Sequence, residues 1–171
     1  MSSPSPTSLE MRLRRLEDRE EIRALDAEYC RVLDDGDWDA LVTLFVADGE
    51  FVGLDRARGH AELRAFFAGL ADGGLTAFWH HVTNLEITLV GDDLAHTRSL
   101  LWQPCVVRGE PHVAAGRYTD TVVRHDGHWR YQRKQVSFDY FCPLAEGWDR
   151  GRLRLPGASA TRPAPDDRPA D

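Results

Sequence analysis

Two long segments flank a tight turn in residues 113–140, VAAGRYTDTVVRHDGHWRYQRKQVSFDY. Asp126-Gly127 lies at the turn, and this dipeptide is a strong signal of a β-hairpin. The flanking segments, Val113 to Arg124 and Trp129 to about Tyr140, are therefore predicted to be two antiparallel strands. The hairpin indicates an antiparallel sheet toward the C-terminal end of the folded chain.

The sequence before the hairpin extends the same sheet. Leu85, Ile87 and Leu89 alternate with polar residues, which is the spacing of a strand. A turn at 91–93 leads to a second long strand over 94–107, and a further turn leads into the hairpin. We expect a meander of four long antiparallel strands.

Helices are predicted before the sheet. From Leu9 to Leu33 apolar residues recur at helical spacing, which predicts a long amphipathic helix with a break near Arg19. A short helix is expected over 38–45, a short strand over 50–53 and a third helix from about residue 59. Helices that precede an antiparallel sheet indicate an α+β domain. If the sheet curves, helices across its open side would make a cone with a pocket inside.

Length and local composition indicate one domain with tails. The chain has 171 residues, which fits a single domain with one substantial core. We expect a flexible N-terminus over residues 1–8, a folded body over 9–155 and a disordered tail over 156–171, because the two ends lack apolar anchors.

The charge balance restricts the partners. The chain has 21 basic and 28 acidic residues and a net charge of −7, which argues against nucleic acid or an anionic membrane as a partner. It contains no apolar run of roughly 18 residues and no apolar N-terminal segment, so we expect a cytoplasmic protein. Three widely spaced cysteines, Cys30, Cys105 and Cys142, predict reduced thiols rather than disulfides or a zinc site.

Two places in the sequence could carry acid–base chemistry, and each has a plain structural alternative. Tyr29 lies on the apolar stripe of the first helix, either as a core residue or at a pocket. Asp34 lies at the end of that helix, either as a solvated turn residue or as a carboxylate turned inward. His80 and His81 begin the first long strand after two aromatic residues. They are either simply packed there or, since alternation lets only one of them face a pocket, one of them enters it. An imidazole oriented by a carboxylate is the usual general base near neutral pH.

A third candidate pair lies on the strand before the hairpin turn. Asp120 and Arg124 share one face of it, and they either enter the cavity or form a ladder on the surface. The sequence has no glycine-rich phosphate loop, no nucleophile elbow and no histidine pair at helical metal-ligand spacing. We therefore expect neither a metal nor a cofactor.

The chain resembles the SnoaL-like branch of the nuclear transport factor 2-like superfamily in a series of short motifs. In order they are REEI at 19–22, LDDGDWD at 33–39, HHVTN at 80–84, GRYTD at 116–120 and DGHWR at 126–130. Within that superfamily it is similar to lyases of the scytalone dehydratase, bile-acid 7α-dehydratase and hexachlorocyclohexane dehydrochlorinase type, the last also through DYFCPLA at 139–145. The resemblance implies a cone-shaped α+β fold with a deep apolar cavity.

The resemblance also implies site residues. The Asp–His dyad of these lyases falls on Asp34 and His80, and a tyrosine of the bile-acid enzyme falls on Tyr29. A hydrogen-bonding Asp of the related ketosteroid isomerase falls near Asp120, which completes the expected catalytic set. The expected substrate-binding residues are Phe51, His81, Trp102, Arg124, Phe138 and Tyr140. The chain departs from its relatives at Trp102, Gln103 and Phe138, where they carry a second His, Asp and Arg.

The expected function is that of a cofactor-independent lyase of the dehydratase type. Its substrate would be a small, largely apolar cyclic or polyketide-like carbonyl compound. A polyketide cyclase or isomerase on the same scaffold is an alternative, and so is a non-catalytic module that binds a small molecule. The resemblance further implies a homo-oligomer, with a trimer favoured over a dimer.

Overall fold

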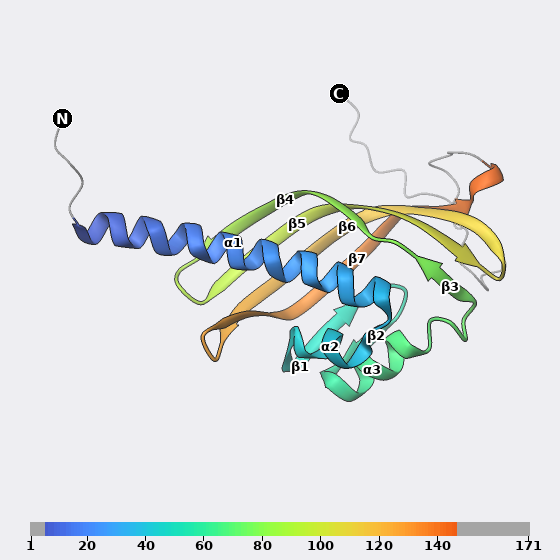
Figure 1. Ribbon diagram of the computed structural model, residues 1–171, viewed down its shortest axis with the longest axis horizontal. Coiled ribbons are helices and arrows are strands. Elements are labelled where there is room, and N and C mark those ends of the chain that lie inside the picture. The colour runs from blue at the N-terminus through green and yellow to red at the C-terminus, as the bar shows by residue number, and fades with distance from the viewer. Residues whose placement is uncertain (1–5, 147–171) are drawn as a thin grey trace, which may run out of the picture.

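The structure is a computed structural model that describes residues 6–146, and it has helices first and most strands afterwards (Figure 1). In chain order the elements are α1 (Pro6–Asp35), α2 (Trp38–Thr43), β1 (Phe45–Val52), β2 (Arg56–Arg58), α3 (Gly59–Ala68), β3 (Leu75–Phe78), β4 (His81–Val90), β5 (Leu94–Val107), β6 (Glu110–His125), β7 (His128–Pro143) and the short 3-10 turn η1 (Leu144–Glu146). The α+β class predicted from the sequence is confirmed.

The sheet is built on the expected meander. Strands β4, β5, β6 and β7 pair antiparallel in chain order. Strand β3 also pairs antiparallel with β5, along the part of β5 that follows its pairing with β4. Strand β1 joins the other edge parallel to β7, with Phe45 opposite Tyr131, and β2 pairs with β1. The sheet therefore curls around its concave face, and the short elements β1, β2, α2 and α3 close one end (Figure 1).

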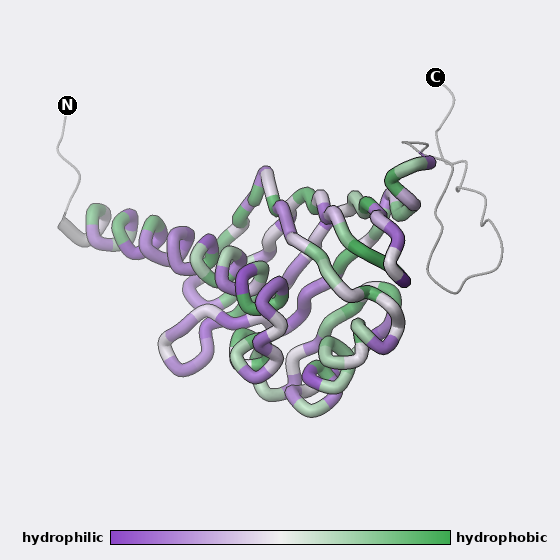
Figure 2. The backbone as a smooth tube through the Cα atoms, turned by 45° about the vertical axis from the view of Figure 1, so that its right-hand side comes forward, coloured by the Kyte–Doolittle hydropathy of each residue, from purple (hydrophilic) through white to green (hydrophobic). Residues whose placement is uncertain are grey.

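Helix α1 lies across the sheet and supplies one side of the core. Its buried apolar residues recur at helical spacing: Ile22, Leu25, Tyr29, Val32 and Leu33. Its N-terminal turns project beyond the sheet, and there Leu9 and Leu13 are exposed (Figure 1). Hydrophilic and hydrophobic residues alternate from turn to turn along this helix, as Figure 2 shows. The amphipathic pattern thus buries one face of α1 only where the sheet lies beneath it.

Several boundaries differ from the sequence prediction. Helix α1 is continuous, with no break at Arg19. The guanidinium of Arg19 donates to the carbonyl oxygen of Ile87 and ties that turn to the sheet. The predicted strand over 50–53 is the end of the longer β1. Strands β2 and β3 were not predicted, since three or four residues carry too little alternation to be recognised.

The chain ends lie partly outside the described residues. Of the N-terminus expected to be flexible, residues 6–8 belong to α1, and residues 1–5 lie outside. The predicted tail over 156–171 and the end of the predicted body, 147–155, also lie outside. Within residues 6–146 no helix is long and apolar enough to cross a membrane, and no cluster of three His, Cys, Asp or Glu side chains could hold a metal ion.

Candidate active site

The end of α1 places a carboxylate beside the start of β4. Gly36 adopts a positive φ of 72°, its N–H donates to the carbonyl of Leu33, and the N–H of Asp37 donates to that of Val32. This pair of hydrogen bonds is the Schellman motif, in which glycine takes the left-handed position at low cost. The motif ends the helix nearly two turns after Tyr29 and leaves Asp34 in its last turn, facing His80.

Asp34 contacts His80 through both carboxylate oxygens. Oδ1 lies 2.6 Å from the ring Nδ1 of His80, and Oδ2 accepts the backbone N–H of the same residue at 2.9 Å. The side chains are 5% and 17% exposed for His80 and Asp34, so the pair is shielded from solvent. Two bonds from one carboxylate fix both the backbone and the ring of His80.

This geometry selects the ring nitrogen that can act as a base. A carboxylate only accepts hydrogen bonds, so Nδ1 carries the proton and Nε2 carries the lone pair. Because the contact is charge-assisted and largely desolvated, it also stabilises the imidazolium that forms when Nε2 takes up a proton. The dyad has the arrangement of an oriented general base.

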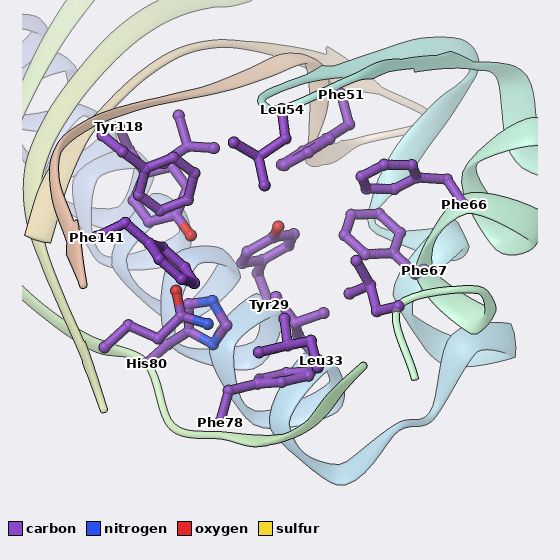
Figure 3. Close-up of a pocket in the computed structure, with 15 residues that line it drawn as sticks. Tyr29, Leu33, Phe51, Leu54, Phe66, Phe67, Phe78, His80, Tyr118 and Phe141 are labelled. Carbon is purple, nitrogen blue, oxygen red and sulfur yellow. The ribbon is translucent and has the colours of Figure 1, made fainter. Parts of the chain in front are cut away.

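A cavity lies against the dyad between α1, α3 and the concave face of the sheet (Figure 3). Its open space is about 70 Å³, and by the same measure one water molecule needs roughly 10–15 Å³. The exposed Leu54 lines it as well, so the cavity reaches the surface there. The polar residues in its wall are Tyr29, His80, Gln103 and Tyr118, and the remainder are Leu33, Phe51, Leu54, Phe66, Phe67, Leu70, Leu75, Phe78, Val136, Phe138 and Phe141.

Tyr29 presents an unpaired hydroxyl to this cavity. Its side chain is fully buried, and its hydroxyl oxygen has no hydrogen-bond partner among residues 6–146. Figure 3 shows that oxygen pointing to the middle of the lining residues. Burial raises the pKa of Tyr29 well above 10, so the phenol stays protonated at neutral pH. It is therefore a hydrogen-bond donor that lacks an acceptor in the wall.

The family profile of the SnoaL-like domain matches residues 14–135. The chain belongs to the SnoaL-like domain family. No curated protein matches it. Its fold and the cavity enclosed by that fold are therefore features of a SnoaL-like domain.

Several solved structures of proteins from Novosphingobium have the same fold as this chain. An NTF2-like protein with a cystatin-like fold from Novosphingobium aromaticivorans is 33% identical, with a TM-score of 0.68 over 80% of this chain and 92% of that one. A putative scytalone dehydratase from the same species is 22% identical, with a TM-score of 0.72 over 91% and 98%. A hexachlorocyclohexane dehydrochlorinase of type 3 from Novosphingobium barchaimii LL02 is 23% identical, with a TM-score of 0.72 over 78% and 94%. These likenesses confirm the SnoaL-like, cone-shaped fold.

The SnoaL-like cavity contains only some of the residues predicted to contact a ligand. Tyr29, His80, Phe51 and Phe138 line it. His81 is exposed and pairs across the sheet with Trp102, and thus of the two adjacent histidines it is His80 that reaches the cavity. The position of Asp34, behind the imidazole of His80, supports it as a partner of the base rather than a contact of the ligand.

Three other predicted binding residues lie elsewhere, which corrects the expectation for them. Trp102 and Tyr140 line a groove on the opposite face of the sheet. Arg124 packs over the ring of Trp129 and forms ion pairs with Asp18 and Asp93, so its charge is used at the other end of the molecule. Trp102 and Tyr140 were expected in the cavity as aromatic wall residues, and the register shift between Ala115 and Gly116 turns Tyr140 to the other face.

Asp120 points inward as expected but does not reach the cavity. Its side chain is fully buried and lies 2.9 Å from the ammonium of Lys134. That ammonium lies against the rings of Tyr118 and Tyr29. Burial raises the pKa of Asp120, although the charge of Lys134 opposes this. In this SnoaL-like protein Asp120 belongs to a buried ionic cluster with Asp26 and Lys134, and the prediction that it contacts a ligand is corrected.

Sequence reasoning missed Lys134, Asp26 and Gln103. Lys134 follows a β-bulge in β7, since Val122 pairs with Tyr131 and Thr121 with Arg133, which leaves Gln132 without a partner. Simple alternation from Trp129 would have pointed Lys134 outward, so only knowledge of the bulge could have placed it inside. Gln103 stood out only as a departure from the relatives, and it lines the cavity.

Proposed function

We propose that this protein is a cofactor-independent lyase in which His80 is the general base. The observation that carries the proposal is the 2.6 Å contact between His80 Nδ1 and Asp34 Oδ1 in the wall of an apolar cavity. A base buried beside apolar walls meets its substrate in a medium that strengthens each electrostatic contact. The dehydratase and dehydrochlorinase named among similar structures support this class of reaction.

The reaction begins with transfer of a proton from carbon to Nε2 of His80. The carbon is one made acidic by a neighbouring carbonyl, and Tyr29 donates a hydrogen bond to the carbonyl oxygen as negative charge develops there. The electron pair of the broken C–H bond then forms a C=C bond, and the leaving group departs with its own electron pair. If the leaving group is hydroxide, the imidazolium of His80 returns the proton to it and water is released.

The lining of the cavity favours a small, largely apolar substrate. Aromatic side chains make up much of its wall, with Phe51, Phe66 and Phe67 in mutual contact at centroid distances of 5.0–5.3 Å. The enclosed volume of about 70 Å³ is smaller than the roughly 150 Å³ of a closed apolar cavity that holds benzene, so a one-ring substrate would also occupy the opening at Leu54. Closure of a polyketide ring and isomerisation use the same first proton transfer and are the alternatives within this proposal.

The test uses 5-nitro-1,2-benzisoxazole, a planar apolar compound that opens when a base removes its C3 proton and the N–O bond breaks. We expect saturable turnover by the wild-type protein, with a loss of about 10²-fold or more in His80→Ala. His125→Ala, which removes an exposed histidine at the end of β6, is the matched control and should keep the wild-type rate. Turnover that is absent, or equal in His80→Ala, would leave a non-catalytic binding pocket as the better explanation.

A further inference from the structure

A lysine ammonium lies behind the wall of the cavity, against the rings of Tyr29 and Tyr118 that line it. Lys134 has no exposed surface, and its Nζ lies over the rings of Tyr29, Tyr118 and Tyr131 at 4.4, 4.2 and 4.5 Å from their centroids. These rings come from α1, β6 and β7, so one cation contacts all three elements. A desolvated ammonium over an aromatic face is an attractive and directional contact.

The ammonium is fully committed to fixed acceptors. It donates to Asp120 Oδ2 at 2.9 Å, to Asp26 Oδ1 at 3.2 Å and to the hydroxyl oxygen of Tyr131 at 3.2 Å. An ammonium has three N–H donors, and each has an acceptor here. The carboxylate of Asp120 is itself held by Thr97 Oγ1 and the backbone N–H of Gln135. Lys134 is therefore a charge of fixed position, without a free N–H to offer a ligand.

The three tyrosines around the ammonium differ in what their hydroxyls do. The hydroxyl of Tyr131 donates to Asp26, so it completes the buried cluster. The hydroxyl of Tyr29 is equally buried, has no partner in the described part of the chain and points into the cavity (Figure 3). Buried hydroxyls are nearly always paired, so the Tyr29 hydroxyl indicates that an acceptor atom belongs in the cavity.

A gain in folding stability does not explain the buried ionic cluster of Lys134, Asp26 and Asp120. Buried ion pairs contribute little net stability, because desolvation offsets their attraction, and well-packed apolar side chains often replace them without loss. What the cluster does provide is a rigid support beneath the Tyr29 ring, whose edges also meet Phe45, Tyr118 and Tyr131. A support of this kind matters where the hydroxyl must hold one direction.

We propose that Lys134 is a positioning residue, which with Asp26 and Asp120 holds the Tyr29 ring so that its hydroxyl donates a hydrogen bond to the oxygen of a bound carbonyl compound. The inference rests on the proposed function only in giving Tyr29 a ligand oxygen to contact. It names the recognised group, a carbonyl or enolate oxygen, and it does not depend on proton transfer to His80.

The test measures the hydrogen bond itself with cyclohexanone labelled with ¹³C at the carbonyl carbon. Hydrogen bonding to the oxygen moves the carbonyl resonance downfield, and the bound-state shift is obtained by titration. We expect the bound carbonyl resonance of the wild-type complex to lie downfield of that of the Tyr29→Phe complex, in which the oxygen loses this donor, and this difference is the shift compared below. The variant Lys134→Met alone strands two buried carboxylates, so the charge-compensated variant Asp26→Asn/Asp120→Asn/Lys134→Met is used, and it should lose more than half of the shift while the protein stays folded.

Two controls separate positioning from general damage. Arg133→Met removes the neighbouring cation, which pairs with Glu50 on the outer side, and should leave the shift unchanged. In a Tyr29→Phe background the triple change should have no further effect on the resonance. A full shift in the triple variant, an equal loss in Arg133→Met, or no shift with the wild-type protein would each overturn the inference. Failure of benzisoxazole turnover with the carbonyl shift intact would overturn only the proposed function.

Discussion

Asp34 binds His80 at two points, although the two residues are 46 positions apart in the chain. One carboxylate oxygen holds the imidazole, and the other holds the backbone N–H at the entry to β4. A carboxylate in the last turn of a helix is disfavoured by the helix dipole, and the two hydrogen bonds from His80 offset that cost. The contact therefore links the end of α1 to the sheet and orients the imidazole at once.

Replacing the carboxylate should disable the base while keeping the fold. In Asp34→Asn the amide can donate to Nδ1, which favours the tautomer with the proton on Nε2 and removes the lone pair that faces the substrate. We expect turnover of 5-nitro-1,2-benzisoxazole to fall by about 10²-fold, measured by steady-state absorbance. Asp35→Asn, which alters an exposed carboxylate paired with Arg31, is the control and should keep full turnover. Equal rates in Asp34→Asn and the wild-type protein would contradict the assigned role.

Removing the unpaired Tyr29 hydroxyl should not weaken the fold. Tyr29→Phe deletes a buried hydroxyl without a partner, so the free energy of unfolding should stay the same or rise by about 1 kcal/mol. Tyr131→Phe deletes a hydroxyl that contacts both Asp26 and Lys134, and it should lower the free energy of unfolding by about 1–3 kcal/mol. Urea denaturation of the two variants provides the comparison. A Tyr29→Phe variant as unstable as Tyr131→Phe would show that Tyr29 has a partner in solution.

The glycine at position 116 is required by close backbone contact. A Cβ there would lie 2.2 Å from the carbonyl oxygen of Ser137, at a β-bulge between β6 and β7. Gly116→Ala should therefore lower the free energy of unfolding by about 3 kcal/mol, as overpacking does at a rigid site. Gly73→Ala, where the nearest atom is 3.3 Å away, is the control and should change it far less. A stable Gly116→Ala protein would mean that the two strands separate more easily than the register indicates.

The two β-bulges between β6 and β7 mark the limit of what the sequence can predict. Periodicity located the four long strands and the first helix, because those elements bury one face over many residues. It failed at Tyr140, since the bulge after Phe138 turns Phe141 toward the cavity and Tyr140 away from it. A single inserted residue reverses every later side chain, and nothing in the local pattern reveals it.

The candidate site was predictable only in part, for a similar reason. Asp34 and His80 were singled out by resemblance, because two residues so far apart cannot be paired by spacing alone. The residues bringing them together are not polar: Gly36 ends α1, and Phe78 packs edge-on against the imidazole at 5.5 Å. Lys134 stayed hidden because a lysine in a strand usually points to solvent, and only its two carboxylates and three rings explain its burial.

Alkaline pH should destabilise the fold through its buried tyrosines. Burial raises the pKa of Tyr29, Tyr118 and Tyr131 well above 10, whereas in the unfolded chain they ionise near 10. Above pH 10 the unfolded chain therefore binds fewer protons than the folded one, and the free energy of unfolding falls by about 1.4 kcal/mol per pH unit for each such group. Below pH 10 this contribution is fully present.

Urea denaturation at intervals from pH 8 to pH 11 measures this slope. Cys30 adds to it from about pH 9, where its thiol ionises in the unfolded chain, because burial raises the pKa of that thiol to about 12 in the folded protein. In Tyr29→Phe the free energy of unfolding should fall less steeply above pH 10, because one of the three buried tyrosines no longer contributes. A free energy of unfolding that stays level up to pH 11 would show that these phenols ionise in the folded protein.

The tautomer of His80 tests the central claim most directly. Two-bond ¹H–¹⁵N correlation spectra of the imidazole at neutral pH distinguish a protonated nitrogen from one with a free lone pair, and His80→Ala identifies the resonance. We predict a proton on Nδ1 and a lone pair on Nε2 in the wild-type protein, with the opposite tautomer in Asp34→Asn. A wild-type His80 with its proton on Nε2 would contradict the account, because the nitrogen that meets the substrate could not then accept a proton.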